Sequence, residues 1–455
     1  MKLKERTIWI GITAFSLAII ILLSFSPGVL AGERDAESQT LLELFYEIFY
    51  FIQDNYVDEK KVESNNLIEG ALKGMFEALD DPYSTYLTSG DMRSMNDTTT
   101  GRFGGVGLII SKVEKGVQVV SPIEDTPAYK VGISAGDLII AVEGASVVDS
   151  TIDEVVNVLR GEPDTAVEVT IQRGKRLTFN VTIIRALIEV PTVKQALIPG
   201  GIGYLRIIQF TPLTPFRVKE ALEFFEENQY QRLIVDLRSN PGGLLDSVVK
   251  IGDMFISRGP IVSTRSRVMS ENQVFSASRK ATIVDRDIPV VVLIDRGSAS
   301  ASEILAGALK DTKRATLLGE KSYGKGSVQQ IRRIGDGGFK LTMSRYYSPS
   351  GATIDKVGIM PDKEIKEPEL TEEEEESFSR LFNEELVKDF VNRDNQPGER
   401  AIASFIEELK SADIDLPDRY VRRLIRIEVN RTNNNPPVYD LEYDLVLREA
   451  VQMFK

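Results

Sequence analysis

One stretch, from Pro289 to Gln329, constrains the fold most, because it alternates strand and helix patterns in a fixed order. The apolar run Pro289–Asp295 predicts a buried strand, and a Gly-Ser turn then opens a helix of small residues, Ser302–Leu309. A second apolar strand follows at Ala315–Leu318. At such a turn a side chain projects from the sheet edge, and free N–H groups of the helix start point the same way. The pattern predicts an α/β core with a place for a hydroxyl nucleophile.

Two missing residue types limit the chemistry of this chain, which has 455 residues with no histidine and no cysteine. A Ser-His-Asp triad, an imidazole metal ligand and a thiol nucleophile are therefore excluded. A hydrolase of this composition must use carboxylates, or a serine or threonine hydroxyl activated by lysine. The formal charge of −13 argues against binding to nucleic acid, and no basic stripe with interleaved aromatic residues is present.

Three serines compete for the nucleophile position at the turn, namely Ser298, Ser300 and Ser302. Serines at such places usually cap helices, and Ser302, which is followed by Glu303 and opens the regular helix, fits that role best. Ser300 occupies the exposed apex of the turn. We therefore predict that Ser300 is the nucleophile and that Ser302 caps the helix.

Backbone N–H groups beside Ser300 are the candidates for an oxyanion hole. The N–H of Ala301 would point towards a carbonyl that Ser300 attacks. Gly242 and Gly243 follow the buried strand Arg232–Leu237, at the carboxyl end where ligands meet parallel sheets. Either glycine could supply the second donor.

The base that activates Ser300 is predicted to be Lys325. A lysine must be desolvated to be neutral near pH 7, and the glycines on both sides of Lys325 allow its backbone to enter a crevice. Gln329, four residues later, can orient the amine without adding charge. The other nearby lysines lie in charged, exposed-looking contexts: Lys310, Lys313 and Lys321.

The segment Gly319–Lys325 is also a near match to the phosphate-binding loop GxxxxGK. Two features argue against that interpretation. Gly326 stands where a serine or threonine would hold magnesium, and Val328–Ile334 reads as a strand instead of a helix. We therefore expect neither a nucleotide nor a metal, and no other cofactor.

Short strands and one short helix, Ile152–Leu159, fill residues 101–186. Gly105, Val106, Gly107 and Leu108 form a glycine-rich loop that enters a strand, and such loops can hold a peptide carboxylate while the peptide adds to the sheet edge. With the later segment PAYKVGISAGDLI, the order resembles a PDZ domain. Arg160, at the end of the helix, is placed to couple peptide binding to the core.

The N-terminus predicts export or membrane insertion, because Lys2, Lys4 and Arg6 precede the apolar run Ile8–Phe25. We favour an uncleaved anchor with everything after about residue 32 extracytoplasmic. Cleavage after Val29-Leu30-Ala31, giving a secreted or periplasmic protein, stays open. Residues 38–56 form an apolar helix that needs partners on two sides, which suggests a homodimer.

Several motifs together resemble the carboxyl-terminal processing serine peptidases, over roughly residues 40–365. They are GSASASEILAGALKD, GEKSYGKGSVQ, DLRSNPGG and LIEGALKGMFEALDDPYSTYLT, with the PDZ-like region between them. The resemblance implies a Ser/Lys dyad assisted by glutamine, on Ser300, Lys325 and Gln329. It also implies a crotonase-like α/β core with an inserted PDZ-like β-rich domain, and helical segments at both ends.

The expected function is a serine endopeptidase that cleaves proteins near their C-termini through an acyl-enzyme. Its PDZ domain would bind or sense unstructured apolar C-termini of protein substrates. Two alternatives stay open: a PDZ-based binding scaffold whose peptidase core is inert, and a P-loop nucleotide hydrolase. The expected domains are an anchor or signal segment at 1–31, a helical region at 32–92, the PDZ domain at 93–186, the peptidase core at 187–366 and an acidic helical region at 367–455, where dimerisation is possible.

Overall fold

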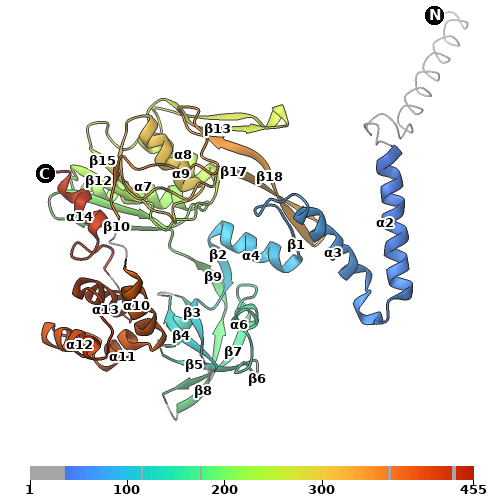
Figure 1. The fold of residues 1–455 in the computed structure, drawn as a ribbon, viewed down its shortest axis with the longest axis horizontal. Helices are drawn as coiled ribbons and strands as arrows, with labels where there is room; N and C mark the ends of the chain where they lie inside the picture. Colours follow the sequence, from blue (N-terminus) through green and yellow to red (C-terminus); the bar gives the residue numbers. More distant parts are fainter. Residues whose placement is uncertain are drawn as a thin grey trace, which may run out of the picture. The chain divides into compact units, whose positions relative to one another are not determined.

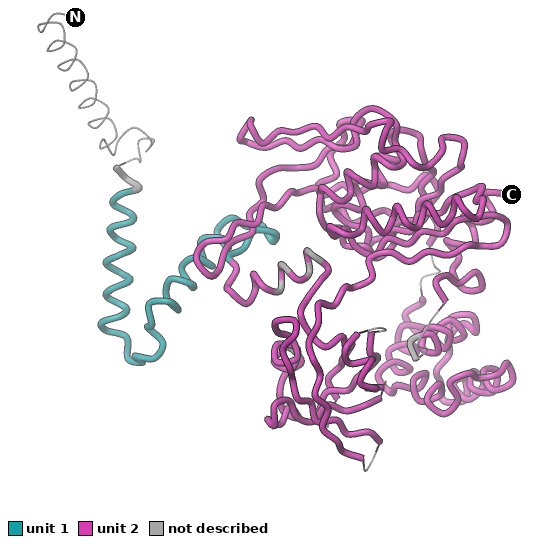
Figure 2. The backbone as a smooth tube through the Cα atoms, turned by 180° about the vertical axis from the view of Figure 1, so that it is seen from behind, with its two compact units in different colours: residues 1–86 teal, residues 87–455 magenta. Residues whose placement is uncertain are grey.

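The computed structural model describes residues 36–113, 116–123, 126–134, 136–174, 177–366, 370–432 and 437–455. The chain divides into two compact units, residues 1–86 and 87–455 (Figure 2). The predicted membrane segment, Ile8–Phe25, lies outside the described residues. Within the described ranges, no helix has the length and apolar character that crossing a membrane requires.

The first unit contains two long helices, α2 (Ala36–Asn55) and α3 (Ser64–Glu77), joined through the short η1 (Glu59–Lys61). Helix α2 corresponds to the apolar helix predicted over residues 38–56. In α2 the apolar side chains surround most of the helix, so this unit alone cannot cover them. The large apolar side chains of α2 that remain exposed include Leu41, Leu42, Leu44, Phe45, Tyr46, Ile48, Tyr50, Phe51 and Ile52.

A six-stranded sheet forms the core of the second unit (Figure 1). Its first pair is antiparallel and all later pairs are parallel. The first two strands were not predicted from the sequence. In spatial order the strands are β10 (Val193–Ile198), β11 (Ile202–Ile207), β12 (Arg232–Asp236), β15 (Val290–Ile294), β16 (Thr316–Gly319) and β19 (Lys363–Glu364).

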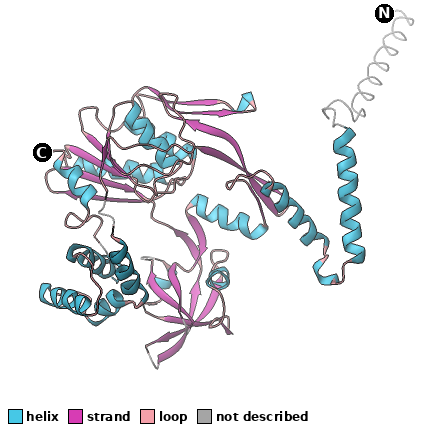
Figure 3. Cartoon of the chain, in the orientation of Figure 1, coloured by secondary structure: helices cyan, strands magenta, loops and turns pink. Residues whose placement is uncertain are grey.

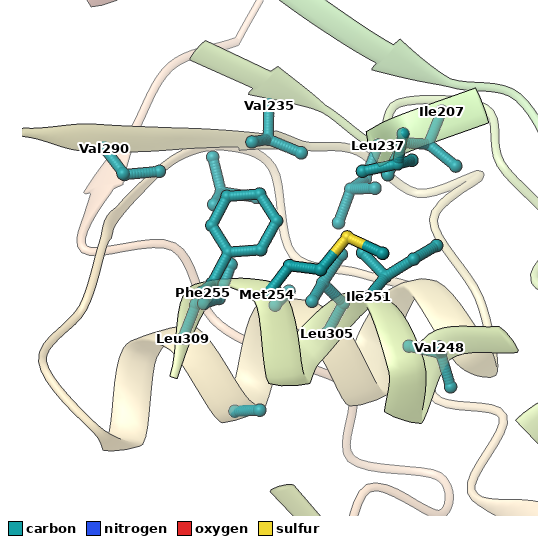
Figure 4. Packing of buried hydrophobic residues seen from close by; sticks show 14 of the residues in the cluster. Ile207, Val235, Leu237, Val248, Ile251, Met254, Phe255, Val290, Leu305 and Leu309 are labelled. Carbon is teal, nitrogen blue, oxygen red and sulfur yellow. The ribbon is translucent and has the colours of Figure 1, made fainter. Parts of the chain in front are cut away.

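Both faces of this sheet are buried, which explains why β15 is a continuous apolar run. On one face, Val290 and Val292 pack in a cluster with three helices, α7 (Thr214–Glu227), α8 (Leu245–Phe255) and α9 (Ala301–Asp311). Figure 4 shows side chains of α8 and α9 meeting those of the strands. On the other face, Val291 and Leu293 pack with α14 (Leu445–Gln452). Successive residues therefore point to opposite layers.

A second sheet extends from the core and includes two hairpins. In them β17 pairs with β18, β18 with β13 and β13 with β14, all antiparallel. The second of these hairpins has η2 (Met269–Glu271) at its tip. The bounds are β13 (Gly259–Ser266), β14 (Gln273–Ala277), β17 (Ser327–Ile334) and β18 (Gly337–Tyr347).

A separate β-rich domain is inserted before the core (Figure 3). It has its own apolar cluster, in which Val117, Val155 and Val169 are fully buried. The chain enters and leaves it through paired strands, β2 (Arg102–Gly105) and β9 (Ala186–Glu189), after helix α4 (Ser89–Thr100). Its main elements are β3 (Leu108–Val113), β4 (Gly116–Pro122), α5 (Pro127–Lys130), β5 (Leu138–Val142), β6 (Ala145–Ser146), α6 (Ile152–Leu159), β7 (Ala166–Arg173) and β8 (Leu177–Ile184).

The acidic region after the core is helical, as predicted. Four helices pack around a cluster of their own, which includes Leu381, Val391 and Ile406. They are α10 (Glu372–Asn383), α11 (Leu386–Arg393), α12 (Glu399–Ser411) and α13 (Asp418–Thr432). The last helix, α14, belongs instead to the core sheet.

Candidate active site

The serine turn lies between β15 and α9, and its three hydroxyls have different environments. The Ser298 hydroxyl is buried and donates to the Leu237 carbonyl at 2.8 Å. The Ser302 hydroxyl, also buried, donates to the Asn240 carbonyl at 2.9 Å. The Ser300 hydroxyl donates to no acceptor within the residues that the structure describes. Ser300 is also buried, at 8% exposed, so the prediction that it occupies an exposed apex was wrong. Of the three, it is the serine whose hydroxyl proton is not donated to a structural acceptor.

Helix α9 begins one residue earlier than predicted, and this corrects the role assigned to Ser302. The N-cap is Ser300, and the first helical residue is Ala301. Ser300 has φ of +53° and ψ of −112°, a conformation that a residue with a side chain rarely adopts. Such strained backbone gathers at functional sites, because the surrounding structure has to hold it there. Ser302 links the turn to Asn240 instead of capping the helix.

Glu303, in the first turn of α9, is the centre of the hydrogen bonds at this site. It is completely buried. Its Oε2 accepts from the backbone N–H groups of Ser300 and Lys325, at 2.8 Å each. Its Oε1 accepts from the Ser322 hydroxyl at 2.6 Å and the Gly324 N–H at 2.7 Å. One carboxylate therefore joins the serine turn to the lysine loop.

Burial raises the pKa of Glu303, and these hydrogen bonds act against that effect. All four donors point at acceptor atoms, an arrangement that suits the ionised form. Sequence reasoning missed this function, and interpreted Glu303 only as a companion of a capping serine. The available signal was an acidic residue within residues 301–309, a stretch that is otherwise small or apolar.

Lys325 lies half-buried in the loop before β17, between two glycines. Burial lowers the pKa of Lys325, the positive charge of Lys340 lowers it further, and Glu303 acts in the opposite direction. The glycines allow the close backbone approach that the sequence suggested, since a Cβ on Gly326 would lie 2.1 Å from the Asp355 nitrogen. By contrast, Lys310 pairs with Asp362 at 3.0 Å.

Gln329 lies on β17, with its side-chain amide held by two hydroxyls. Its Nε2 donates to Ser327 Oγ at 2.8 Å and to Thr342 Oγ1 at 3.3 Å. The donor end of the amide is therefore occupied, and Oε1 is the atom suited to accept from an amine. The segment after Lys325 is a strand, as predicted, and not the helix that a phosphate-binding loop requires.

The two candidate oxyanion glycines differ in what their N–H groups do. The Gly242 N–H donates to Asn240 Oδ1 at 2.9 Å, so it is already engaged. The Gly243 N–H donates to no acceptor among the described residues, and neither does that of Ala301, the first residue of its helix. A Cβ on Gly242 would lie 2.8 Å from Ser300 Cβ, so this loop directly adjoins the serine. Gly243 and Ala301 are the available donors.

Asn240 is a second residue that sequence reasoning missed. Its side chain donates to the Ile207 carbonyl at 2.8 Å and accepts from Gly242. Its carbonyl accepts from the Ala299 N–H at 3.0 Å, besides the Ser302 hydroxyl. Asn240 thus ties the glycine loop to both β11 and the serine turn. Nothing in the sequence beyond its place before Pro241 indicated this.

The predicted peptide loop of the β-rich domain connects β2 to β3. Gly105 ends β2, Val106 is buried, Gly107 has φ of +82°, and Leu108 starts β3. Within the part of the domain that the structure describes, strand β3 pairs with β4 alone and forms an edge of its sheet. Such an edge can accept a peptide as an added strand.

Arg160, immediately after α6, pairs with Asp97 of α4 at 3.0 Å. Its guanidinium also lies over the Phe103 ring, 4.9 Å from the centroid. It therefore connects the end of the helix beside β3 to the segment that leads into the domain.

Comparison with known proteins identifies three regions. Residues 201–365 match Peptidase family S41, residues 118–173 match a PDZ domain, and residues 28–90 match the activating protease CtpB N-terminal domain. A carboxy-terminal-processing protease of Bartonella bacilliformis is 38% identical over 397 residues, which cover 85% of this chain and 89% of that protein. The carboxy-terminal processing protease CtpA of Bacillus subtilis is 31% identical over 353 residues, 77% of this chain and 75% of that one.

Among solved structures, the photosystem II D1 C-terminal processing protease is similar with a TM-score of 0.42 and 30% identity, covering 71% of this chain and 92% of its own. The predicted fold class is confirmed: a mixed α/β peptidase fold with an inserted PDZ domain and helical segments at both ends. The extent of its similarity to the Bartonella protein places the chain in peptidase family S41, as a serine-type carboxy-terminal processing protease.

Proposed function

We propose that the protein is an endopeptidase in which Ser300 is the nucleophile, Lys325 the base and Gln329 the residue that orients the lysine amine. The observation that carries this proposal is the shared acceptor, Glu303 Oε2, to which the backbones of Ser300 and Lys325 both donate. One carboxylate thereby holds the backbones of a serine whose hydroxyl has no structural acceptor and of a lysine whose pKa is lowered, which supports their pairing.

The chemistry follows from these groups. Neutral Lys325 takes the proton of the Ser300 hydroxyl while Oγ bonds to the substrate carbonyl carbon. The N–H groups of Ala301 and Gly243 stabilise the resulting oxyanion. Protonated Lys325 then gives its proton to the leaving amine, and the C–N bond breaks to leave an ester on Ser300. Water attacks the ester, Lys325 accepts the proton of that water, and the proton returns to Ser300 as the acid leaves.

The substrate class proposed is a protein with an unstructured apolar C-terminus. The edge strand β3 and the loop from Gly105 to Leu108 support binding of that terminus, since added-strand peptides use N–H groups at a sheet edge. Cleavage by the core would then occur near the captured end.

We further propose an extracytoplasmic, membrane-tethered homodimer. The basic residues before Ile8–Phe25 support the tether. The exposed apolar side chains of α2 support a second copy, because a soluble helix rarely leaves so many uncovered. Cell fractionation with protease accessibility tests the first part. Size-exclusion chromatography with light scattering, comparing the wild type with Ile48→Lys, tests the second, and a monomeric wild type would contradict it.

The catalytic assignment is tested by intact-mass labelling with a serine-reactive phosphonate, combined with cleavage of a protein with an apolar C-terminus. We expect Ser300→Ala to lose both labelling and cleavage, and Lys325→Ala to slow both by at least about a thousandfold. Lys321→Ala, an exposed lysine of the same loop, is the matched control and should behave as the wild type. Undiminished cleavage by Ser300→Ala would overturn the assignment. No cleavage by the wild type would favour the binding scaffold.

A further inference from the structure

A buried chain of charged groups connects the C-terminal helix α14 to the loop that follows β12. The Arg238 guanidinium lies between two carboxylates. It donates to Asp236 from Nε at 2.9 Å and from Nη2 at 2.6 Å. It donates to Asp444 from Nη1 at 2.8 Å and from Nη2 at 2.6 Å. The Tyr204 hydroxyl completes the chain by donating to Asp236 at 2.7 Å.

Asp444 occupies a special place in this chain because it also caps α14. Its Oδ1 accepts from the Leu447 N–H at 2.9 Å. The helix behind it packs Val446, Leu447 and Ala450 against the outer face of the core sheet. The first turn of α14 is therefore fixed both by apolar packing and by the ion pair with Arg238.

Arg238 begins the loop that adjoins the serine. The next residue, Ser239, has φ of +56° and donates from its N–H to Asp295 at 2.8 Å. Asn240 then accepts from the serine turn through its carbonyl and holds the Gly242 N–H through its side chain. Gly243 follows, with the free N–H assigned above to the oxyanion hole. A displacement of Arg238 would be transmitted to these groups within five residues of backbone.

We propose that Asp444 is a positioning residue for the oxyanion loop: by holding Arg238 in a fixed orientation, the C-terminal helix sets the position of the Gly243 N–H beside Ser300. This inference rests on the proposed catalytic function of Ser300. It assigns to α14 a function in catalysis, besides covering the sheet.

Two features distinguish this arrangement from an ordinary surface ion pair. Asp236 is completely buried, and Arg238 and Asp444 are only 18% and 22% exposed. Burial by itself would raise the pKa of Asp236, but Arg238 and Tyr204 hold it below its usual value. Asp236 therefore stays ionised at neutral pH, and the contribution of its ion pair with Arg238 is geometric. The planar guanidinium, bound on two edges, has one orientation available.

The helix offers a matched control. Glu449 also lies on α14 and also pairs with a core cation, Lys363 of β19. Glu449→Gln and Asp444→Asn each neutralise one carboxylate of the same helix, and asparagine retains a capping oxygen. Only Asp444→Asn weakens the ion pair with Arg238. Loss of α14 docking in general would affect both variants alike.

The experiment measures kcat and KM for a short peptide substrate and inhibition by a peptide aldehyde, whose tetrahedral adduct needs the oxyanion hole. We expect Asp444→Asn to lower kcat at least about tenfold, with KM within twofold and with inhibition weakened in parallel. Glu449→Gln should leave all three within twofold. In an Arg238→Gln background, Asp444→Asn should have no further effect.

The proposal is overturned if Asp444→Asn leaves kcat unchanged, or if both variants lose activity in proportion to their fall in Tm. It is also overturned if inhibition by the aldehyde is unchanged while kcat falls. Failure of the catalytic assignment is a different result: Ser300→Ala would then remain active, whatever the activity of Asp444→Asn.

Discussion

The backbone nitrogens of Ser300 and Lys325 donate to the same atom, Oε2 of Glu303, at 2.8 Å each. The two residues are separated in sequence by the whole of α9 and β16, yet a single buried carboxylate fixes both. It fixes their backbones and leaves their side chains to react. A Ser/Lys pair needs such a support because neither side chain can anchor the other while a proton moves between them.

Replacing Glu303 by glutamine should therefore disrupt the pair. The amide keeps the size of the carboxylate, but its NH₂ group would face two of the four donors. A buried donor left without an acceptor costs about 1–3 kcal/mol. We expect kcat/KM and the rate of phosphonate labelling to fall at least about tenfold. Peptide cleavage assays measure the first, and intact-mass spectrometry measures the second.

Glu320→Gln is the control for Glu303→Gln, since this carboxylate follows β16 and pairs with Arg296 at 2.7 Å, outside the site. It should retain wild-type rates. If Glu303→Gln labels as fast as the wild type, the shared acceptor does not position the pair.

The pH dependence of kcat/KM should reflect Lys325. Only its neutral form accepts a proton, so the rate should rise with pH through a pKa below the ordinary lysine value of 10.5. Lys340→Gln removes the like charge that lowers this pKa. The ascending limb should then shift to higher pH, with activity lost near neutrality and the plateau unchanged. Lys321→Gln makes the same charge change on an exposed lysine and should leave the profile in place.

The lowered pKa of Lys325 should also make the stability of the protein depend on pH. A lysine whose pKa is lowered in the folded state binds fewer protons there than in the unfolded chain. The free energy of unfolding therefore rises with pH between the two pKa values. This slope should be smaller in Lys340→Gln, as measured by urea unfolding at a series of pH values. If Lys340→Gln changes neither the pH profile of kcat/KM nor the pH slope of the unfolding free energy, the charge of Lys340 does not lower the pKa of the base.

The sequence was sufficient to predict elements whose periodicity is strong. The bounds of α6, Ile152–Leu159, agree with the prediction. The strands predicted in this region also formed, since alternation such as the buried Val167, Val169 and Ile171 of β7 allows one register only. The order of motifs around Ser300 and Lys325 was also predictable. Each depends on a local pattern of strand, glycine and small residues.

Relationships between distant segments were not predictable in this way. The sequence around Glu303 does not indicate that N–H groups from the loop of Lys325 donate to its carboxylate. Arg238 and Asp444 are 206 residues apart in sequence and meet only through the docking of α14. The start of α9 was misplaced for a similar reason. The φ of +53° at Ser300 is imposed by the surrounding fold, and residue preferences alone favour Ser302 as the cap.

Substitution of Gly242 should damage the site through direct collision. An alanine Cβ would lie 2.7 Å from the Ala299 carbonyl oxygen and 2.9 Å from the Ala301 nitrogen, at φ of +104°. Gly200→Ala is the matched control: its φ is +95°, and nothing lies within 4 Å of the added atom. We expect Gly242→Ala to lower kcat by about tenfold or more, since overpacking a site costs about 1–3 kcal/mol. Equal activities in the two variants, measured with the same short peptide, would argue against close packing of this loop on Ser300.

Recognition of the substrate C-terminus should depend on the conformation of Gly107. Its φ is +82°, and an added Cβ would lie 2.3 Å from the Thr126 side chain, whose hydroxyl donates to the Gly107 carbonyl at 3.1 Å. Gly107→Ala must therefore shift the loop that leads into the edge strand β3. Gly144→Ala, in the same domain, has φ of +75° with open space around it and serves as the control.

Binding of a fluorescent peptide with an apolar C-terminus to the full chain carrying Ser300→Ala measures this recognition without cleavage. We expect Gly107→Ala to weaken binding at least about tenfold, because main-chain hydrogen bonds at the edge supply the affinity of added-strand peptides. Gly144→Ala should bind as tightly as its parent. The rate of phosphonate labelling in chains that retain Ser300 should be unchanged by either glycine substitution if the loop acts only in binding. Tight binding by Gly107→Ala would place peptide recognition elsewhere, and slower labelling would mean that the loop also influences the state of the catalytic pair.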